Sequence, residues 1–529
     1  MYFNSTILTD ILLFVGIYYL FLFVVALHVK DVQQGNDYRY FYFVIIPAKN
    51  EEKVIENAIN ACLRFRGDNY RIVVVDDNSN DSTPLIVNSI CKSNPKVVLL
   101  NNILNQRKRG KGSVLNYAFR QISFAISQDF IEPFNLQNSF TDSFDKEHII
   151  IGVFDADAVP AENILYEISS VFSNLEVDAI QTTVRISNRN QSLLAKMQDI
   201  EFLGFSRIIQ KARSKFGSVG LGGNGQFSRL SSLDKIGLEP WGSTLTEDFE
   251  LGLRMISKGM RLYFTDKTIV EQEGIISLRA LLKQRTRWLQ GHFTNWKYIP
   301  SIIKSNVPLI TKIDTLIYIV FVSVVFLVGL SLTLSVLSIL RVIVVENKML
   351  EVFYNKNYIL GLIALTAYSF AFIPMFIYSV FKFYKDRNFF NKVFYVFLFA
   401  AYTYIWLPAG VAALYRLLTK RTEWLKTTRV AITTPSFAYA IEGAGFRNER
   451  RRVPRFVFHT YAFVNQGPCF IVNLSTLGAK IIMPDKNQIN DQSTLSLDIP
   501  LFESKQAKIV WQKESRGLIT AGLEFVSSN

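Results

Sequence analysis

Four long apolar segments constrain the fold of this chain more than any other feature of its sequence. They cover residues 7–28, 314–345, 358–380 and 390–416 of 529. About 20 apolar residues are enough for a helix to cross a bilayer. No basic run precedes the first segment and no small-residue cleavage site follows it, which favours an uncleaved anchor over a signal peptide. We therefore predict a transmembrane anchor over residues 1–30 and interfacial and transmembrane helices over 276–420.

The charges around these segments predict which side of the membrane they face. Lys and Arg number 58 against 44 Asp and Glu, a net charge of +14. Basic runs at 382–387 and 418–429 favour a cytoplasmic position for both flanks. Three crossings after a cytoplasmic domain would leave the C-terminus outside, so either 314–345 or 390–416 must form a hairpin or lie flat. The basic excess suits an anionic membrane face or a phosphorylated ligand better than a nucleic acid polymer.

Strands alternate with helices between the first two apolar segments. Apolar strands are expected in 41–47, 71–79, 96–102 and 148–158. This alternation predicts an α/β domain over residues 40–275, with a parallel sheet covered by helices on both faces. Ligands of such sheets bind beyond the carboxyl ends of the strands. The three cysteines, Cys62, Cys91 and Cys469, are too far apart to indicate a zinc site or a disulfide framework.

Carboxylates stand at two of these predicted strand ends. Asp76 and Asp77 end one strand, and they have an alternative explanation as caps of the next helix. Asp155 and Asp157 follow another strand in the sequence "FDADA". Alternate residues of an extended chain point the same way, so these two side chains can converge. Their oxygens suit Mg²⁺ or Mn²⁺, and the alternative is a solvated loop pair.

Two further stretches carry charged residues in patterns with more than one explanation. Thr246 begins a helix whose first turn holds Glu247 and Asp248. These are a capping box, or a general base beside a metal–diphosphate. In "QRTRWLQGH", Arg287 is suited to a departing diphosphate and Trp288 to a sugar ring. An interfacial amphipathic helix with aromatic and basic anchors is the alternative, and the two explanations are compatible.

The order of these motifs resembles that of the processive family 2 glycosyltransferases, which include cellulose, chitin and hyaluronan synthases. The shared motifs are "PAKNEE", "VVVDDNSNDST", "RGKGSVLN", "FDADAVP", "GGNGQFSR", "LTEDFELGLR" and "QRTRW". They cover about residues 40–300. The resemblance implies a glycosyltransferase-A-type sheet and a channel made by the later helices. The gating-loop signature of cellulose synthases is missing, and "RTEWLKTTR" at 421–429 stands in its place, which puts pure cellulose in doubt.

The resemblance implies a role for each matching residue. Asp76, Asp77 and Lys111 would hold the uridine part of a nucleotide sugar. Asp155 and Asp157 would coordinate its diphosphate through Mg²⁺ or Mn²⁺. Asp248, next to Glu247, would deprotonate the acceptor in an inverting displacement. The remaining residues would shape the acceptor end or serve the leaving diphosphate and the acceptor sugar: Gly223, Asn224, Gly225, Gln284, Arg287 and Trp288.

Short strands after residue 430 predict a small β-barrel over 430–529. The basic run "RNERRRVPRF" before them has a simple alternative as a membrane-surface patch. Together with "NLSTLG", however, it resembles the PilZ domain, which binds cyclic di-GMP. The resemblance implies a ligand site made of these residues: Arg451, Arg452, Arg455, Asn473, Ser475 and Gly478.

The sequence therefore predicts a multi-pass enzyme of a bacterial inner membrane, with its catalytic and PilZ-like domains in the cytoplasm. Its expected reaction is processive transfer from a UDP-sugar to a growing, secreted β-glucan, activated by cyclic di-GMP. UDP-glucose is the first choice of donor, while UDP-N-acetylglucosamine and GDP-mannose remain open. A non-processive transferase with a lipid acceptor is the alternative. An inactive receptor for cyclic di-GMP is disfavoured because Asp155, Asp157, Asp248 and Arg287 are all present.

Overall fold

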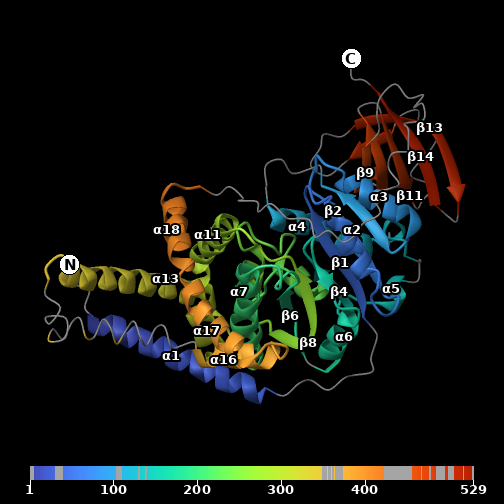
Figure 1. The fold of residues 1–529 in the computed structure, drawn as a ribbon. Helices are drawn as coiled ribbons and strands as arrows, with labels where there is room; N and C mark the ends of the chain where they lie inside the picture. The colour runs from blue at the N-terminus through green and yellow to red at the C-terminus, as the bar shows by residue number, and fades with distance from the viewer. Residues whose placement is uncertain are drawn as a thin grey trace. The chain divides into compact units, whose positions relative to one another are not determined.

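A computed structural model describes most of the chain (Figure 1). The described residues are 5–29, 40–102, 110–128, 131–136, 140–174, 176–347, 354, 359, 363, 373–421, 456–465, 467–475, 478–483, 495–498, 505–515 and 518–526. The chain divides into two compact units. Unit 1 comprises 1–39, 158–236 and 240–429, and unit 2 comprises 40–157, 237–239 and 430–529. The domain boundaries expected from the sequence stay a prediction.

Unit 2 contains the predicted parallel sheet. Its four strands, in the hydrogen-bonded order β3-β2-β1-β4, are all parallel. Their Val- and Ile-rich faces are buried, as expected for strands covered on both sides. α3 packs on β2 and β3, while α4 contacts β1 and β2. The elements are β1 Phe41–Ala48, α2 Ile55–Cys62, β2 Tyr70–Asp76, α3 Thr83–Ser93, β3 Val97–Asn101, α4 Lys111–Ser127, η1 Glu132–Phe134, α5 Phe140–Ser143 and β4 Ile149–Val153.

Unit 1 contains strands that the sequence did not predict, and their pairing is mixed. β6 runs parallel to β8 and antiparallel to β7, while the short β5 pairs antiparallel with β8. A purely parallel sheet is therefore wrong for this part of the fold. The elements are β5 Val159–Pro160, α6 Ile164–Asn174, β6 Ala179–Ile186, β7 Gln226–Arg229, α9 Leu230–Ile236, α10 Glu247–Ser257 and β8 Leu262–Gln272.

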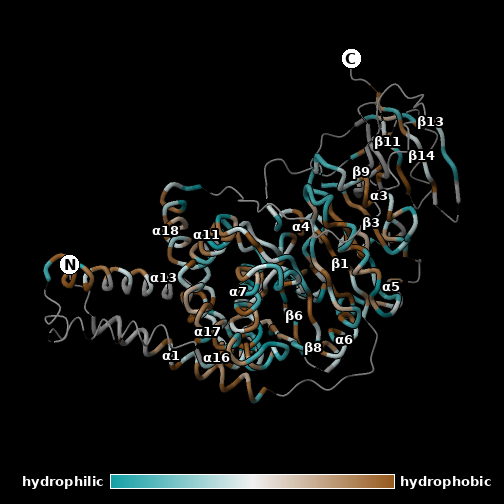
Figure 2. Tube along the Cα trace, viewed as in Figure 1, coloured by the Kyte–Doolittle hydropathy of each residue, from teal (hydrophilic) through white to brown (hydrophobic). Residues whose placement is uncertain are grey.

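The other helices of unit 1 share an apolar core. α1 packs on α8, and α16 and α17 pack on α7. Leu22, Ile200, Leu203, Phe376 and Phe399 are among the buried residues of this core, and Figure 2 shows hydrophobic colouring along α16 and α17. The helices are α1 Ser5–His28, α7 Leu193–Glu201, the π-helix η2 Phe202–Ile208, α8 Ile209–Ser214, α11 Leu278–Thr294, η3 Asn295–Tyr298, α12 Ile299–Lys304, α13 Leu309–Val344, α16 Ile373–Phe383, α17 Phe389–Thr403 and α18 Trp406–Leu418.

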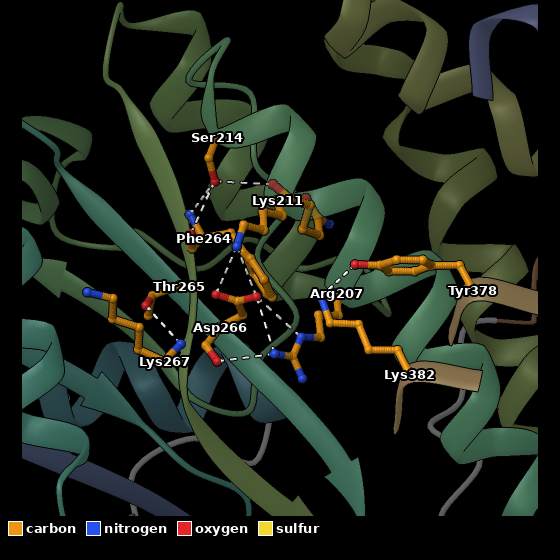
Figure 3. Close-up of polar contacts among 10 residues, drawn as sticks. Arg207, Lys211, Ser214, Phe264, Thr265, Asp266, Lys267, Tyr378 and Lys382 are labelled. Atoms are coloured by element: carbon orange, nitrogen blue, oxygen red, sulfur yellow. Dashed lines mark hydrogen bonds and ion pairs between the residues drawn. The ribbon is translucent and has the colours of Figure 1, made fainter. Parts of the chain in front are cut away.

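An ion-pair cluster of Arg207, Lys211 and Asp266 joins these helices to β8. The register between β6 and β8 shifts at Thr265–Ile269, and Asp266 lies in this irregularity. Its carboxylate accepts from Arg207 at 3.2 Å and from Lys211 at 3.2 Å (Figure 3). The Arg207 guanidinium also lies 4.3 Å from the ring centre of Phe383 at the end of α16. One aspartate therefore links β8 to η2, α8 and α16.

Among the described residues, one helical run has the length and apolar composition to cross a membrane. This run is Phe389–Leu418, and shorter apolar helices are found at Phe14–His28 and Ile164–Ser173. The run is broken, because α17 ends at Thr403 and α18 begins at Trp406. Most of the predicted segment 358–380 lies outside the described residues. Several crossings stay a prediction.

Six antiparallel strands form the C-terminal part of unit 2. Their hydrogen-bonded order, β10-β11-β14-β13-β12-β9, closes on itself. Val464, Cys469, Ile471, Ile481 and Leu523 are buried inside it. The free thiols are those of Cys62, Cys91 and Cys469. The strands are β9 Phe456–Val464, β10 Gly467–Ser475, β11 Gly478–Met483, β12 Leu495–Asp498, β13 Lys505–Ser515 and β14 Leu518–Phe525.

Candidate active site

The carboxyl ends of the parallel strands in unit 2 gather polar side chains, as the sequence predicted. Ala48 pairs in register with Asp76, and Asp76 pairs with Asn101, so β1, β2 and β3 end at one edge. Asp77 receives Lys49 at 3.0 Å on one carboxylate oxygen and the amide of Asn102 at 3.0 Å on the other. Residues that follow three different strands thus meet around one carboxylate.

Asp76 lies beneath this edge and has an unused oxygen. Only 5% of its surface is exposed, and its Oδ2 accepts from the backbone N–H of Ser79 at 3.1 Å. Its Oδ1 is buried and has no hydrogen-bond partner. Burial raises the pKa of this carboxyl above its ordinary value. An incoming N–H donor would satisfy the free oxygen.

The capping explanation for the two aspartates is wrong. The residue that precedes α3 as its cap is Ser82, five residues after Asp77. Asp76 and Asp77 instead begin a turn in which Asn78 adopts a φ of 57°. Asn50 fastens the turn to the end of β1, since its N–H donates to Ser79 at 2.9 Å and its side chain accepts from Asn80 at 2.7 Å.

Asp155 and Asp157 follow β4 at the same edge. The ammonium of Lys111, at the start of α4, lies 2.5 Å from Asp155 Oδ1. Asp157 is 8% exposed. Among the described residues, no three His, Cys, Asp or Glu side chains gather into a metal-binding group. Two hard carboxylates fit Mg²⁺ or Mn²⁺, which takes its other ligands from water and phosphates.

The loop "GGNG" in unit 1 is held from both neighbouring strands. Gly223 and Gly225 have φ values of 75° and 70°. Gln181 on β6 donates to the carbonyl of Asn224 at 2.7 Å, and Gln272 on β8 accepts from its amide at 2.9 Å. Asn224 is 1% exposed, so the loop is fixed to the sheet rather than free to move as a lid.

Glu247 and Asp248 form the first turn of α10 in unit 1. Thr246 is the capping residue by position, yet its side chain makes no capping hydrogen bond. Its hydroxyl instead accepts from Asn295 at 3.0 Å. The capping-box explanation is therefore wrong. The start of this helix is tied to the chain that follows α11.

α11 brings the "QRTRW" motif against this turn. Arg287 donates to the carbonyl of Leu245 at 3.4 Å. A Cβ atom on Gly291 would lie 2.5 Å from the hydroxyl oxygen of Thr246, so the glycine allows the two helices to touch. Burial lowers the pKa of the neighbouring His292 to about 4, which keeps its imidazole neutral at physiological pH. The first turn of α10 also contains Glu250, which Lys297 and the Tyr298 hydroxyl bind at 2.8 and 2.6 Å.

Trp288 does not present two open faces for a sugar. The Arg285 guanidinium lies 4.1 Å from the centre of its ring system, and the ring of Trp406 lies 6.5 Å away. Gln284 accepts a hydrogen bond from Arg285 at 2.8 Å. Arg285 was not among the residues predicted from sequence, although it lies inside the motif. Nothing in the motif distinguishes its buried role from the role of Arg287.

The proposed cyclic di-GMP residues are described only in part. Arg451, Arg452 and Arg455 lie outside the described residues. Along the backbone, Asn473 pairs with Lys480 and Ser475 pairs with Gly478, at the turn between β10 and β11. A Cβ on Gly478 would run into the carbonyl oxygen of Leu523 on β14. The glycine is thus required for close strand packing, which is a structural reason for its presence.

Comparisons with known proteins agree with this arrangement. Residues 39–291 match the family model "Glycosyltransferase like family 2". The chain is 30% identical over 283 residues to the beta-monoglucosyldiacylglycerol synthase of Trichormus variabilis, covering 53% of this chain and 54% of that protein. It is 24% identical over 400 residues to the probable glycosyltransferase YdaM of Bacillus subtilis, covering 73% and 86%. The chain spans about half the length of the first of these relatives.

A solved structure shares the fold. The mannosyltransferase of Pyrobaculum calidifontis, solved in complex with GDP-Man and Mn²⁺, matches with a TM-score of 0.50 at 16% identity. The match covers 79% of this chain and 98% of that one. At this identity the likeness concerns the fold alone. Residues 39–291 of this chain are thus similar to the glycosyltransferase-like family 2 in sequence, and the chain shares the fold of a solved mannosyltransferase.

Proposed function

We propose that the protein is a membrane-associated hexosyltransferase that moves a sugar from a UDP-sugar, UDP-glucose first, to a hydroxyl of a membrane lipid. Relatives named beta-monoglucosyldiacylglycerol synthases support a lipid acceptor over the growing β-glucan that the sequence first suggested. The surface of α17 supports membrane association. Phe390, Phe394 and Phe397 are 81%, 51% and 63% exposed at a spacing that puts them on one helix face.

The strand edge of unit 2 would bind the donor. The free Oδ1 of Asp76 suits the imide N–H of a uracil base, because a buried acceptor without a partner gains most from a donor. Lys111 would exchange its contact with Asp155 for the diphosphate. A divalent ion held by Asp155 and Asp157 would offset the diphosphate charge. A role in donor binding would explain why a carboxylate that does not cap α3 is buried at residue 76.

The first turn of α10 would activate the acceptor. Asp248 would take the proton of the acceptor hydroxyl, and the oxygen would then attack the anomeric carbon. The bond from that carbon to the diphosphate oxygen breaks with its electron pair, which leaves UDP and inverts the configuration. Arg287 would pair with the diphosphate as its charge grows. Glu247, which is 4% exposed, would lie next to this base in the same helical turn.

The observation that carries the proposal is the contact between "QRTRW" and the acidic turn. Arg287 reaches the carbonyl of Leu245, and Gly291 packs on Thr246. Both contacts lie within the three residues that precede Asp248, which supports a role for Arg287 in the same reaction.

The test uses purified protein in lipid nanodiscs with labelled nucleotide sugars and diacylglycerol. We expect labelled glycolipid in the organic phase with UDP-glucose. Asp248→Asn and Arg287→Ala should each lower turnover by at least about 100-fold. Asp68→Asn makes the same chemical change at a side chain that is 92% exposed and should have no effect. Full activity of Asp248→Asn would overturn the assignment of the base, and no transfer from any nucleotide sugar would overturn the function.

The second candidate is the processive, cyclic di-GMP-activated β-glucan synthase of a bacterial inner membrane. The ordered motifs of residues 40–300 favour it. Its product would stay out of the organic phase and be degraded by β-glucanases. Cyclic di-GMP should stimulate its formation, and Arg455→Ala should abolish the stimulation. Glycolipid as the sole product, with no response to cyclic di-GMP, would exclude this candidate.

A further inference from the structure

Glu201 lies where four helices of unit 1 meet: α7, α11, α17 and α18. It is the last residue of α7, directly before the π-helix η2, and it is 7% exposed. π-helical turns are rare and are often found at functional sites. The partner of Glu201 is Arg285 of α11, a residue with no exposed surface. The two residues lie 84 positions apart in sequence, and Arg285 belongs to the "QRTRW" motif itself.

Every carboxylate oxygen of Glu201 has a partner. Oε2 accepts from the Arg285 guanidinium and from the hydroxyl of Tyr402 at 2.7 Å. Oε1 accepts from the indole N–H of Trp406 at 3.2 Å. The same guanidinium donates to the Tyr402 oxygen at 3.1 Å. A buried ion pair is costly unless its charged groups are hydrogen-bonded. Both Glu201 oxygens are bonded, while the Nε of Arg285 is buried without a partner, so an arrangement that lost the contacts to Glu201 would leave still more buried polar atoms unpaired.

The network fixes the rotation of α11 from the side opposite to Arg287. Residues two apart on a helix differ by about 200° around its axis. Arg285 therefore points into the core when Arg287 points to Leu245 and the acidic turn. Trp288 is held in the same way, since the Arg285 guanidinium covers one of its faces at 4.1 Å. A rotation that broke the buried pair would move both motif residues.

We propose that Glu201 and Arg285 are positioning residues that determine where Arg287 and Trp288 lie. Through their hydrogen bonds to Glu201, Tyr402 and Trp406 make these positions depend on the segment where α17 ends and α18 begins. The inference rests on the proposed function, because Arg287 and Trp288 matter here only through the roles which that reaction gives them. The four residues do not touch substrate. They act through the orientation of α11.

A second network in the same unit provides a matched control. Asp199, also on α7 and with no exposed surface, binds Arg185 through two contacts of 2.8 Å. It accepts from the hydroxyl of Tyr384 at 2.5 Å. These partners lie on β6 and directly after α16. Tyr384→Phe and Tyr402→Phe thus each remove one hydroxyl from a buried Asp or Glu of α7, and only the second change reaches α11.

The experiment compares the two tyrosine variants in nanodiscs by melting temperature and by kcat and KM for each substrate. The melting temperature of both variants should fall by a similar amount. Tyr402→Phe should lower kcat/KM for the acceptor by roughly tenfold and leave the donor KM unchanged. Tyr384→Phe should leave all kinetic constants near wild type. Glu201→Gln should lower kcat/KM for the acceptor more than Tyr402→Phe does. Arg285→Lys should have an intermediate effect, because lysine keeps the charge but cannot donate from a planar guanidinium to Glu201 and Tyr402 together.

The outcomes separate this inference from the proposed function. Wild type without transferase activity would remove the proposed function. An active wild type with equal kinetics for Tyr402→Phe and Tyr384→Phe would overturn the positioning role alone. A fall in activity that only follows the fall in melting temperature, for both variants, would also overturn it.

Discussion

Gly291→Ala tests the contact on which the proposed active site depends. A methyl group there would lie 2.5 Å from Oγ1 and 2.6 Å from Cγ2 of Thr246, whereas ordinary contact begins near 3.4 Å. Thr246 is 9% exposed and hydrogen-bonded to Asn295, so its side chain has little room to turn away. The helices must then separate by roughly 1 Å, and a shift of that size at a reacting group costs about 100-fold in rate.

Stability should change much less than activity. Overpacking costs about 1–3 kcal/mol, while replacing glycine by alanine inside a helix gains about 1 kcal/mol. The two effects leave a net loss of roughly 0–2 kcal/mol, so the variant should fold. The assay is steady-state sugar transfer in nanodiscs, with the melting temperature measured on the same preparation.

Gly252→Ala is the matched control for this substitution. Gly252 lies inside α10, and its new methyl would meet Leu221 and Leu262 at 3.5 and 3.6 Å, which is ordinary contact. This variant should keep full activity. Adding Thr246→Ala to Gly291→Ala removes both clashing atoms and should restore part of the rate. Equal activity of Gly291→Ala and Gly252→Ala, or no recovery in the double variant, would refute the reasoning.

Three further predictions follow from buried groups. Burial raises the pKa of Asp76, so the carboxylate is protonated at a higher pH than an ordinary aspartate. As the pH is lowered, the affinity for UDP, measured by calorimetry, should therefore begin to fall above the pH at which an ordinary aspartate titrates, and Asp76→Asn should abolish this dependence. An affinity that stays unchanged until the pH reaches the ordinary aspartate range would contradict the prediction. Burial raises the pKa of Asp266, but Arg207 and Lys211 outweigh it and hold the pKa below its ordinary value. Its contribution to stability is therefore present above the unfolded-state pKa and lost as pH falls through the folded one, so Asp266→Asn should lower the melting temperature at neutral pH and less in acid; an equal deficit at both would count against the ion pairs. Gly478→Ala should destabilise the C-terminal strands by about 1–3 kcal/mol, seen as faster proteolysis, because the obstacle is a backbone oxygen; Gly522→Ala, which meets only the half-exposed Trp511 side chain, should do so less, and the reverse order would contradict this account.

The sequence predicted the parallel half of the fold because its signals are local. Runs such as "RIVVVD" are rich in β-branched residues, and two of the four predicted strands end in a carboxylate, so the strand and the edge follow from one pattern. The grouping of Asp77 with Lys49 and Asn102 confirms that edge. The strands of unit 1 were missed because β6 reads "AIQTTVRI", where buried polar residues such as Gln181 bind the next loop instead of marking a surface.

The acidic turn shows how a correct element can carry a wrong explanation. The sequence placed the helix start at Thr246, which the structure confirms, and offered a capping box for its polar residues. The threonine hydroxyl faces Asn295, 49 residues later, and so cannot cap the helix. Arg285 and Glu201 were missed for a similar reason, since a partner 84 residues away leaves no periodic signal.

The touching point of Thr246, Gly291 and Asn295 limits how the sequence of α10 and α11 can vary. Since a Cβ atom on Gly291 has no room beside Thr246, these two positions cannot change through small, independent substitutions. Variation along the two helices must then come from residues that face away from this contact.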